Sequence, residues 1–211
     1  MNPKPLRHVD VFSSAGKLEA LYRDLQDPAA VAVVCHPHPI GGGTMHNKVV
    51  FRAARGLEAA NLATLRFNFR GTSNSAGQHE GGEGEQGDVV AAIDWLTKMH
   101  PGVKIIVGGF SFGAWVASRA ACEIAAVDAL FLIGTPVNKY DFGYLRSCEK
   151  PMLILHGTQD EFGDVDKVEK LGQQLRNAET IIITGADHFF TKQIDAVEET
   201  LRIWATGIIE G

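Results

Sequence analysis

Residues 103–120, VKIIVGGFSFGAWVASRA, decide the fold of this chain. The β-branched apolar run at 103–107 predicts a buried parallel strand, and the small and apolar residues at 114–120 predict a buried helix. Between them lies a G-x-S-x-G turn, Gly109-Phe110-Ser111-Phe112-Gly113. A chain that turns from strand to helix in so few residues brings backbone close to backbone, which favours glycine and strains the middle residue. The pattern therefore predicts that Ser111 is exposed at the C-terminal end of a sheet.

The composition is that of an ordinary globular protein. Of 211 residues, 45% are hydrophobic and 21% are charged, so we expect residues 1–211 to form a single domain. A net charge of −5 provides no basic surface for nucleic acid, and no apolar run is long enough for a signal peptide or a membrane span. The cysteines, Cys35, Cys122 and Cys148, are odd in number and show no C-x-x-C spacing, which indicates a reducing compartment, the cytoplasm.

Strand and helix patterns alternate along most of the chain. Segments 7–13 and 17–23 alternate around a Ser-Ala-Gly turn and predict an N-terminal antiparallel hairpin. Further strands are expected at 30–35, 62–69, 127–133, 151–156 and 180–184, and helices at 47–60, 87–100, 165–177 and 194–208, with a glycine-rich loop at 70–86. This order predicts an α/β fold with a mostly parallel, doubly wound sheet. Because only 134–149 separate two of the strands, no cap domain fits there.

Two loops downstream of Ser111 contain the partners that a serine nucleophile needs. The G-x-S-x-G turn alone is also compatible with a serine that merely caps the next helix. A catalytic serine requires a base within hydrogen-bond reach and an acid that orients the base, in the chain order serine, acid, histidine. Asp160 follows one strand and is our acid, with Glu161 a weaker alternative and Asp164 better placed to cap the next helix. His188 follows the last strand and is our base.

An oxyanion hole requires two backbone N–H groups. One is expected at Phe112, directly after the serine, and the other in the His-Pro-His-Pro loop after strand 30–35. Pro37 and Pro39 have no N–H, which leaves His38 as the donor.

A zinc site is the rival interpretation of that loop, because His36 and His38 form an H-x-H pair. A third ligand would have to come from His46 or Asp160, and we therefore expect no metal and no cofactor. The expected substrate pocket is apolar. Its candidate residues are Met45, Arg70, Phe110, Tyr140, Phe142, Phe162 and Phe189. Arg70 could instead pair with a loop acid such as Glu83 or Glu85.

Five stretches together carry a family resemblance. They are CHPHPIGGGTMHNKVV, FNFRGTSNSAGQHEGGEGEQGDVVAAIDWL, GGFSFGAWVA, LHGTQDEF and GADHFF. The chain resembles, over essentially its whole length, the small lidless α/β-hydrolases of bacteria and plants, near the dienelactone hydrolases and carboxylesterases. The resemblance implies the α/β-hydrolase fold and a triad of Ser111, Asp160 and His188. Dienelactone hydrolases use a cysteine where this chain has Ser111, which argues against that particular activity.

The leading hypothesis is a serine hydrolase that cleaves small or soluble acyl esters through an acyl-enzyme. A thioesterase or small-peptide hydrolase would use the same triad, and a non-catalytic ligand-binding protein could keep the same frame. A small-molecule acyl substrate is the expected partner, with no nucleic acid and no membrane. Exposed sheet edges are compatible with a homodimer.

Overall fold

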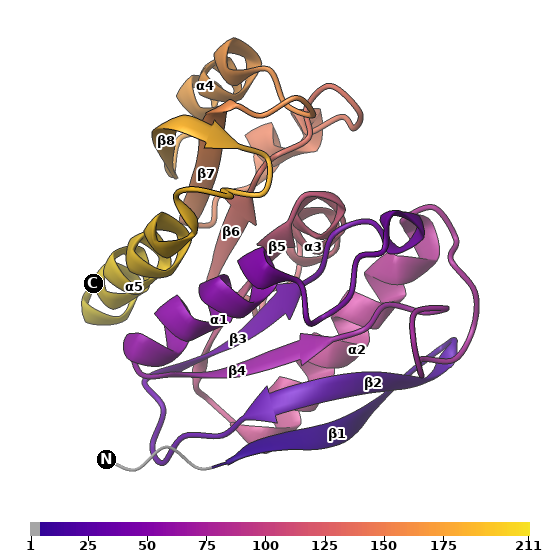
Figure 1. The fold of residues 1–211 in the computed structure, drawn as a ribbon. Helices are drawn as coiled ribbons and strands as arrows, with labels where there is room; N and C mark the ends of the chain where they lie inside the picture. The colour runs from indigo at the N-terminus through magenta and orange to yellow at the C-terminus, as the bar shows by residue number, and fades with distance from the viewer. Residues whose placement is uncertain (1–4) are drawn as a thin grey trace.

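The computed structural model, which describes residues 5–211, contains one sheet of eight strands (Figure 1). The strand order across the sheet is β1-β2-β4-β3-β5-β6-β7-β8. The strands are β1 Leu6–Ser13, β2 Gly16–Arg23, β3 Ala30–Cys35, β4 Leu62–Phe67, β5 Lys104–Phe110, β6 Ala129–Ile133, β7 Met152–Gln159 and β8 Ala178–Asp187. The helices are α1 Lys48–Ala59, α2 Glu83–Met99, α3 Phe112–Ala121, α4 Val165–Gln174 and α5 Ile194–Glu210, with short 3-10 turns η1 Pro39–Gly41 and η2 Gly143–Ser147.

The strand directions confirm the predicted architecture. β1 and β2 form an antiparallel hairpin, and β2 pairs antiparallel with β4. Every other pairing, from β4 through β3 to β8, is parallel. Between β6 and β7 the described chain contains only η2, so no lid covers the C-terminal edge of the sheet.

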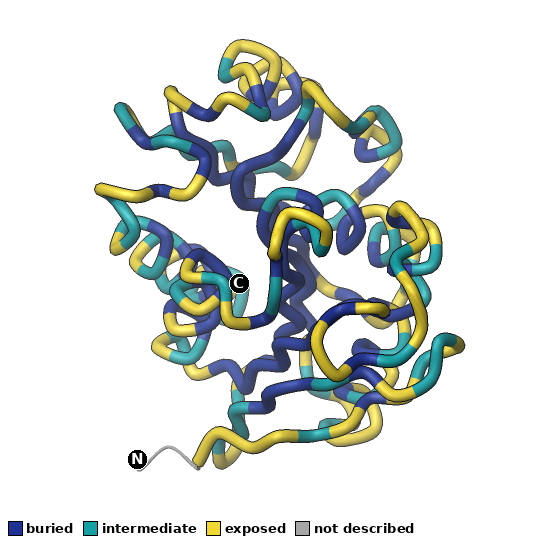
Figure 2. Tube along the Cα trace, turned by 45° about the vertical axis from the view of Figure 1, so that its right-hand side comes forward, coloured by how far each residue is buried: buried dark blue, intermediate teal, exposed yellow. Residues whose placement is uncertain are grey.

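Helices cover both faces of the sheet. α2, α3 and α4 enclose one apolar cluster with the strands, and α1 and α5 enclose the other. The central strands are buried along nearly their whole length, while the helices turn their exposed sides to solvent (Figure 2). This burial on both faces explains why strands such as β3, AVAVVC, are continuous apolar runs. Within residues 5–211, no helix combines the length and apolar character needed to cross a membrane.

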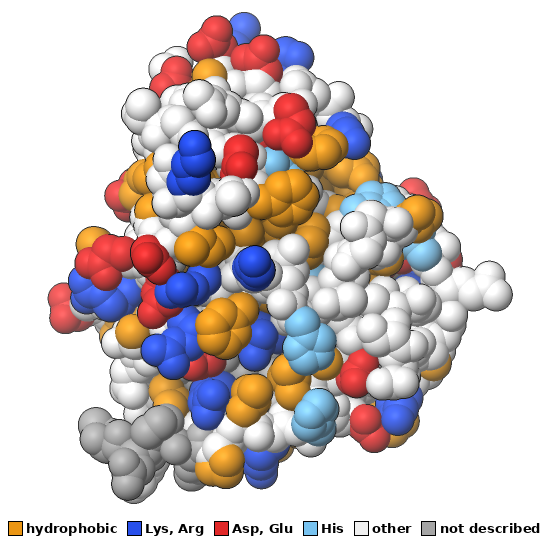
Figure 3. All heavy atoms as spheres, viewed as in Figure 1, with side chains coloured by type: hydrophobic (Ala, Val, Ile, Leu, Met, Phe, Trp, Pro, Cys, Tyr) orange, Lys and Arg blue, Asp and Glu red, His pale blue; other side chains and the backbone are white. Residues whose placement is uncertain are grey.

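α1 and α5 pack so closely that one position requires glycine. A Cβ added at Gly56 would lie 2.2 Å from the Glu198 carbonyl oxygen. At the edge of this contact Arg52 Nη1 lies 2.9 Å from Glu198 Oε2 and 2.8 Å from Asp195 Oδ1. Acidic and basic side chains accordingly gather over these two helices, at the left of Figure 3.

One predicted boundary was wrong for a specific reason. α2 begins at Glu83, inside the segment expected to be a glycine-rich loop. The buried Glu85 carboxylate accepts hydrogen bonds from the backbone N–H groups of Gly82 at 2.7 Å and Glu80 at 2.9 Å. A side chain in the first turn that binds the N–H groups of the N-cap and of the residue two before it lets the helix start among glycines. The remaining elements differ from expectation mainly at their ends, for example β4, which ends at Phe67.

Candidate active site

Ser111 occupies a strained turn between β5 and α3. Its backbone has φ 57° and ψ −120°, a conformation that residues other than glycine rarely adopt. The turn passes so close to the loop after β3 that a Cβ at Gly109 would lie 2.6 Å from the Cys35 carbonyl oxygen. A Cβ at Gly113 would lie 2.4 Å from the His36 carbonyl oxygen. The two glycines of the motif therefore make room for the backbone, which leaves Ser111 at the edge of the sheet.

His188 and Asp160 lie in line with Ser111. His188 Nε2 is 2.9 Å from Ser111 Oγ, and His188 Nδ1 is 2.7 Å from Asp160 Oδ2. A carboxylate can only accept, so the ring proton lies on Nδ1 and Nε2 is left to accept the serine proton. The structure thus brings together the three side chains expected from the sequence, in an order suited to proton transfer.

The Asp160 carboxylate is held from both sides. Its Oδ1 accepts hydrogen bonds from the backbone N–H groups of Phe162 at 2.8 Å and Gly163 at 3.2 Å, which leaves Oδ2 for His188. The neighbouring Glu161 is exposed, and Asp164 Oδ1 accepts from the Asp166 N–H as the N-cap of α4. Of the three nearby acids, Asp160 is therefore the one that contacts His188.

His156, within β7, supports this loop and was missed by the sequence reasoning. It is fully buried, its Nε2 donates to the Gly163 carbonyl at 2.8 Å, and its Nδ1 lies 3.7 Å from Asp160 Oδ2. Burial lowers the pKa of His156, which favours the neutral ring. A histidine in the apolar strand that leads to the acid, four residues before it, is the only signal the sequence offers for this role.

The loop after β3 presents the second expected oxyanion donor. His38 is the N-cap of η1, and its Nδ1 accepts from the Ile40 N–H at 3.2 Å. Gly43 closes the loop against Pro37, since a Cβ there would lie 2.1 Å from the Pro37 carbonyl oxygen. Within the described chain the backbone N–H groups of His38 and Phe112 donate no hydrogen bond, so both remain candidates for the oxyanion hole.

His36 is unsuited to the zinc ligand role considered for it. Its Nδ1 donates to the Pro37 carbonyl at 2.7 Å, and its Nε2 accepts from the Phe69 N–H at 3.0 Å. Burial lowers its pKa to about 4, so the ring is neutral with both nitrogens engaged. Among residues 5–211, no group of three or more His, Cys, Asp or Glu side chains is arranged to hold a metal ion.

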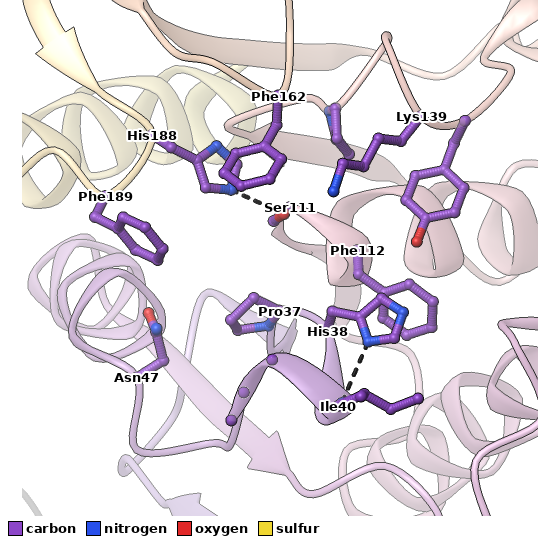
Figure 4. Close-up of a pocket in the computed structure, with 15 residues that line it drawn as sticks. Pro37, His38, Ile40, Asn47, Ser111, Phe112, Lys139, Phe162, His188 and Phe189 are labelled. Carbon is purple, nitrogen blue, oxygen red and sulfur yellow. Dashed lines mark hydrogen bonds between the residues drawn. The ribbon is translucent and has the colours of Figure 1, made fainter.

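A cavity of about 430 Å³ opens in front of Ser111 (Figure 4). Tyr140, Phe162 and Phe189 line it, as expected. Side chains that were not expected also line it, among them Ile40, Asn47, Pro136 and Lys139. The position of Pro136 and Lys139 just after β6 was the available signal, because loops that follow parallel strands meet at one edge of the sheet. On the face drawn in Figure 3, hydrophobic side chains gather across the middle.

Three of the expected pocket residues belong instead to the core. Phe110 is fully buried and lies beneath His188, with 4.8 Å between ring centroids. Met45 is fully buried, and Phe142 packs at the other core cluster beside a separate groove. Apolar composition does not distinguish a cavity wall from the core behind it, which is why these assignments were wrong.

The family model described as an alpha/beta hydrolase domain matches residues 30–206. This span includes both oxyanion candidates and all three aligned side chains. The chain belongs to the α/β-hydrolase family. Membership supports hydrolase activity in general.

Relatives of this α/β-hydrolase include proteins of known structure. This chain is 39% identical to an uncharacterized protein of Rickettsia prowazekii over 198 residues, which cover 89% of this chain and 83% of that protein. A serine hydrolase homologue from Coxiella burnetii is 32% identical with a TM-score of 0.88, covering 93% of this chain and 96% of the other. A serine hydrolase without lid from Xanthomonas campestris is 30% identical with a TM-score of 0.86, covering 96% and 94%.

Arg70 of this α/β-hydrolase is a structural residue outside the pocket. It is 4% exposed, and its Nη2 and Nε lie 2.9 Å and 3.1 Å from the Asp88 carboxylate, while its Nη1 lies 2.9 Å from Glu80 Oε1. Neither Glu83 nor Glu85, the partners considered from the sequence, pairs with it. The Asp88 hydrogen bonds raise the pKa of Arg70 and tie the loop after β4 to α2.

Proposed function

We propose that this α/β-hydrolase is a serine hydrolase that cleaves small or soluble acyl esters through a covalent acyl-enzyme. The observation that carries the proposal is the continuous hydrogen-bonded row from Ser111 Oγ through His188 to Asp160, with distances of 2.9 Å and 2.7 Å. An unassisted serine hydroxyl is a weak nucleophile at neutral pH, and an adjacent oriented imidazole removes that limitation.

The first step forms the bond between Ser111 Oγ and the ester carbonyl carbon, while the hydroxyl proton passes to His188 Nε2. Asp160 stays ionised throughout, and its negative charge stabilises the imidazolium. The carbonyl oxygen becomes an oxyanion, for which the His38 and Phe112 backbone N–H groups are the proposed donors. Each such donor contributes roughly 3 kcal/mol to transition-state stabilisation.

The second half of the reaction releases the products. The alcohol leaves with the proton from His188, and the acyl group stays on Ser111 as an ester. Water then attacks that ester, gives its proton to His188 Nε2, and the acid departs as the serine hydroxyl is restored.

The absence of a lid between β6 and β7 favours substrates that enter from solvent. A cavity of about 430 Å³ fits a small acyl group with its leaving group, within the range of ordinary ligand pockets. We propose the cytoplasm as the site of action, since Cys35, Cys122 and Cys148 are all free thiols.

Labelling with a fluorophosphonate probe tests the proposal directly. Such probes react with activated serines, so the adduct should be found on the peptide that contains Ser111. Ser111→Ala should abolish the adduct, and His188→Ala should slow it strongly. A folded protein that takes up no label, and hydrolyses neither a nitrophenyl ester nor a thioester, would contradict the proposal and favour a ligand-binding role.

A further inference from the structure

The cavity in front of Ser111 contains an uncompensated positive charge. Apart from the histidines, Lys139 is the single charged side chain among its lining residues, and none of them is Asp or Glu. A neighbouring cleft shares Gly42, Asn47 and Phe189 with this cavity, and its only charged side chain, histidine again aside, is Lys48. The linings of these two cavities thus carry lysine side chains and no Asp or Glu, although the chain as a whole has a net charge of −5.

Lys139 is held at the cavity by its loop and by an aromatic ring. Its backbone N–H donates to the Pro136 carbonyl at 2.9 Å, and its Nζ lies 4.4 Å from the centroid of the Phe162 ring. Figure 4 shows the amine end extending past Phe162 toward the interior of the cavity, on the side of Ser111. A cation–π contact of this kind restrains a flexible lysine without neutralising its charge.

Apart from its contact with the Phe162 ring, the charge of Lys139 has no partner within the described chain. Within residues 5–211, Lys139 forms no ion pair, and its Nζ donates no hydrogen bond. Other lysines do take part in the fold, since the Lys150 amine donates to the carbonyls of Ile124 and Val127 at 2.8 Å and 2.6 Å. The positive charge of Lys139 also acts on His38. Burial, His79 and Lys139, in that order, lower the pKa of His38.

Two further polar side chains, His38 and Asn47, line other parts of the cavity, across from Lys139 in Figure 4. His38 Nδ1 accepts from Ile40, so the proton of its neutral ring is on Nε2. Asn47 Oδ1 accepts from the Val49 N–H at 2.9 Å as the N-cap of α1, which leaves the amide NH₂ as the unused end of that side chain. The cavity lining therefore carries an ammonium group, two N–H donors and no carboxylate, a composition that favours an anionic ligand.

We infer that this cavity selects acyl esters that carry a second, ionised carboxylate a few carbons from the scissile ester, and that Lys139 binds that carboxylate. The substrates are then monoesters of dicarboxylic acids. This inference rests on the proposed serine hydrolase function and specifies its substrate class. Lys139 is a specificity residue in this scheme and takes no part in bond making.

The experiment compares two nitrophenyl esters that differ in one charge. The mono-nitrophenyl ester of glutarate carries a free carboxylate, and its methyl-capped diester does not. We measure the ratio of kcat/KM for the two in wild type, in Lys139→Met, which keeps the length of the side chain, and in Lys139→Glu. Lys170→Met is the matched control, because Lys170 is an exposed lysine beside a separate groove.

The wild type should prefer the anionic ester roughly two- to fivefold, as expected for one exposed charge pair. Lys139→Met should abolish the preference, Lys139→Glu should reverse it, and Lys170→Met should retain it. The preference should also fall when the salt concentration rises from about 0.01 M to about 1 M. Hydrolysis of both esters with no preference, or a preference that survives in Lys139→Met, overturns the inference and leaves the proposed function intact.

Binding of monomethyl glutarate to the Ser111→Ala protein separates the two proposals. Weaker binding after Lys139→Met, with no hydrolysis by the wild type, would keep the anion site and overturn the hydrolase function. If the wild type hydrolyses neither ester, and monomethyl glutarate binds the Ser111→Ala protein equally well with and without Lys139→Met, both the hydrolase function and the anion site are overturned.

Discussion

Replacing Asp160 with asparagine should nearly abolish hydrolysis while leaving the fold intact. The side chain oxygen that accepts from the Phe162 and Gly163 N–H groups can be retained by the amide, so the loop keeps its shape. The group that faces His188 Nδ1 at 2.7 Å becomes an NH₂ donor instead of an acceptor. His188 must then place its ring proton on Nε2, where it can no longer accept the proton of Ser111.

The size of this loss follows from the tautomer. In serine hydrolases an acid-to-amide change of this kind lowers kcat by about 10⁴-fold, which corresponds to roughly 5.5 kcal/mol of transition-state stabilisation. We would measure kcat for a nitrophenyl ester and the thermal midpoint of each protein. The matched control is Glu161→Gln, which makes the same chemical change one residue along the chain on an exposed side chain. A loss below tenfold in folded Asp160→Asn, or an equal loss in the control, would refute the assignment of Asp160 as the orienting acid.

Three further predictions concern stability, measured as the free energy of unfolding in denaturant. Burial holds the pKa of His36 at about 4, against 6.5 for an exposed histidine, so the unfolded chain binds the proton at higher pH than the folded chain does. As the pH falls from 6.5 to 4, the free energy of unfolding should therefore drop by about 3 kcal/mol through this group. His36→Gln should make this pH dependence less steep, and an unchanged slope would be the contrary result. Gly56→Ala should lower the free energy by about 1–3 kcal/mol because the new Cβ would meet the α5 backbone at 2.2 Å, whereas Gly207→Ala, with nothing within 4 Å, should not; equal effects would count against the packing argument. Arg70→Met leaves the Asp88 carboxylate buried without its cation and should cost about 3–5 kcal/mol, and a cost below about 1 kcal/mol would contradict the structural role of the pair.

Much of the sheet could be predicted because its strands are buried on both faces. Such strands are continuous apolar runs, like AVAVVC in β3, and they stand out from the helices between them. The start of α2 could not be predicted in the same way. Glycines dominate the local composition there, and the helix depends on the buried Glu85 carboxylate that closes its first turn.

The aligned side chains of Ser111, Asp160 and His188 could be expected because strand order alone brings the ends of β5, β7 and β8 to one edge of the sheet. The walls of the cavity could not, since they depend on where each side chain points. Phe189 is 49% exposed and lines the cavity, while the next residue, Phe190, is completely buried. No sequence pattern separates two adjacent phenylalanines. The same holds for Lys139, whose proposed role depends on the absence of Asp and Glu from the cavity lining.

The place of His188 beside an edge strand has a consequence for how this protein is made. Ser111 and His188 are 77 residues apart, and β8 pairs only with β7, so the imidazole reaches the serine only after the final strand has joined the sheet. At ordinary translation speeds of about 5–20 residues per second, roughly 4–15 s pass between synthesis of the serine and of its base. Under the proposed mechanism, a nascent chain on the ribosome therefore has the serine turn but no histidine beside it, and the serine would become reactive only after β8 has paired with β7.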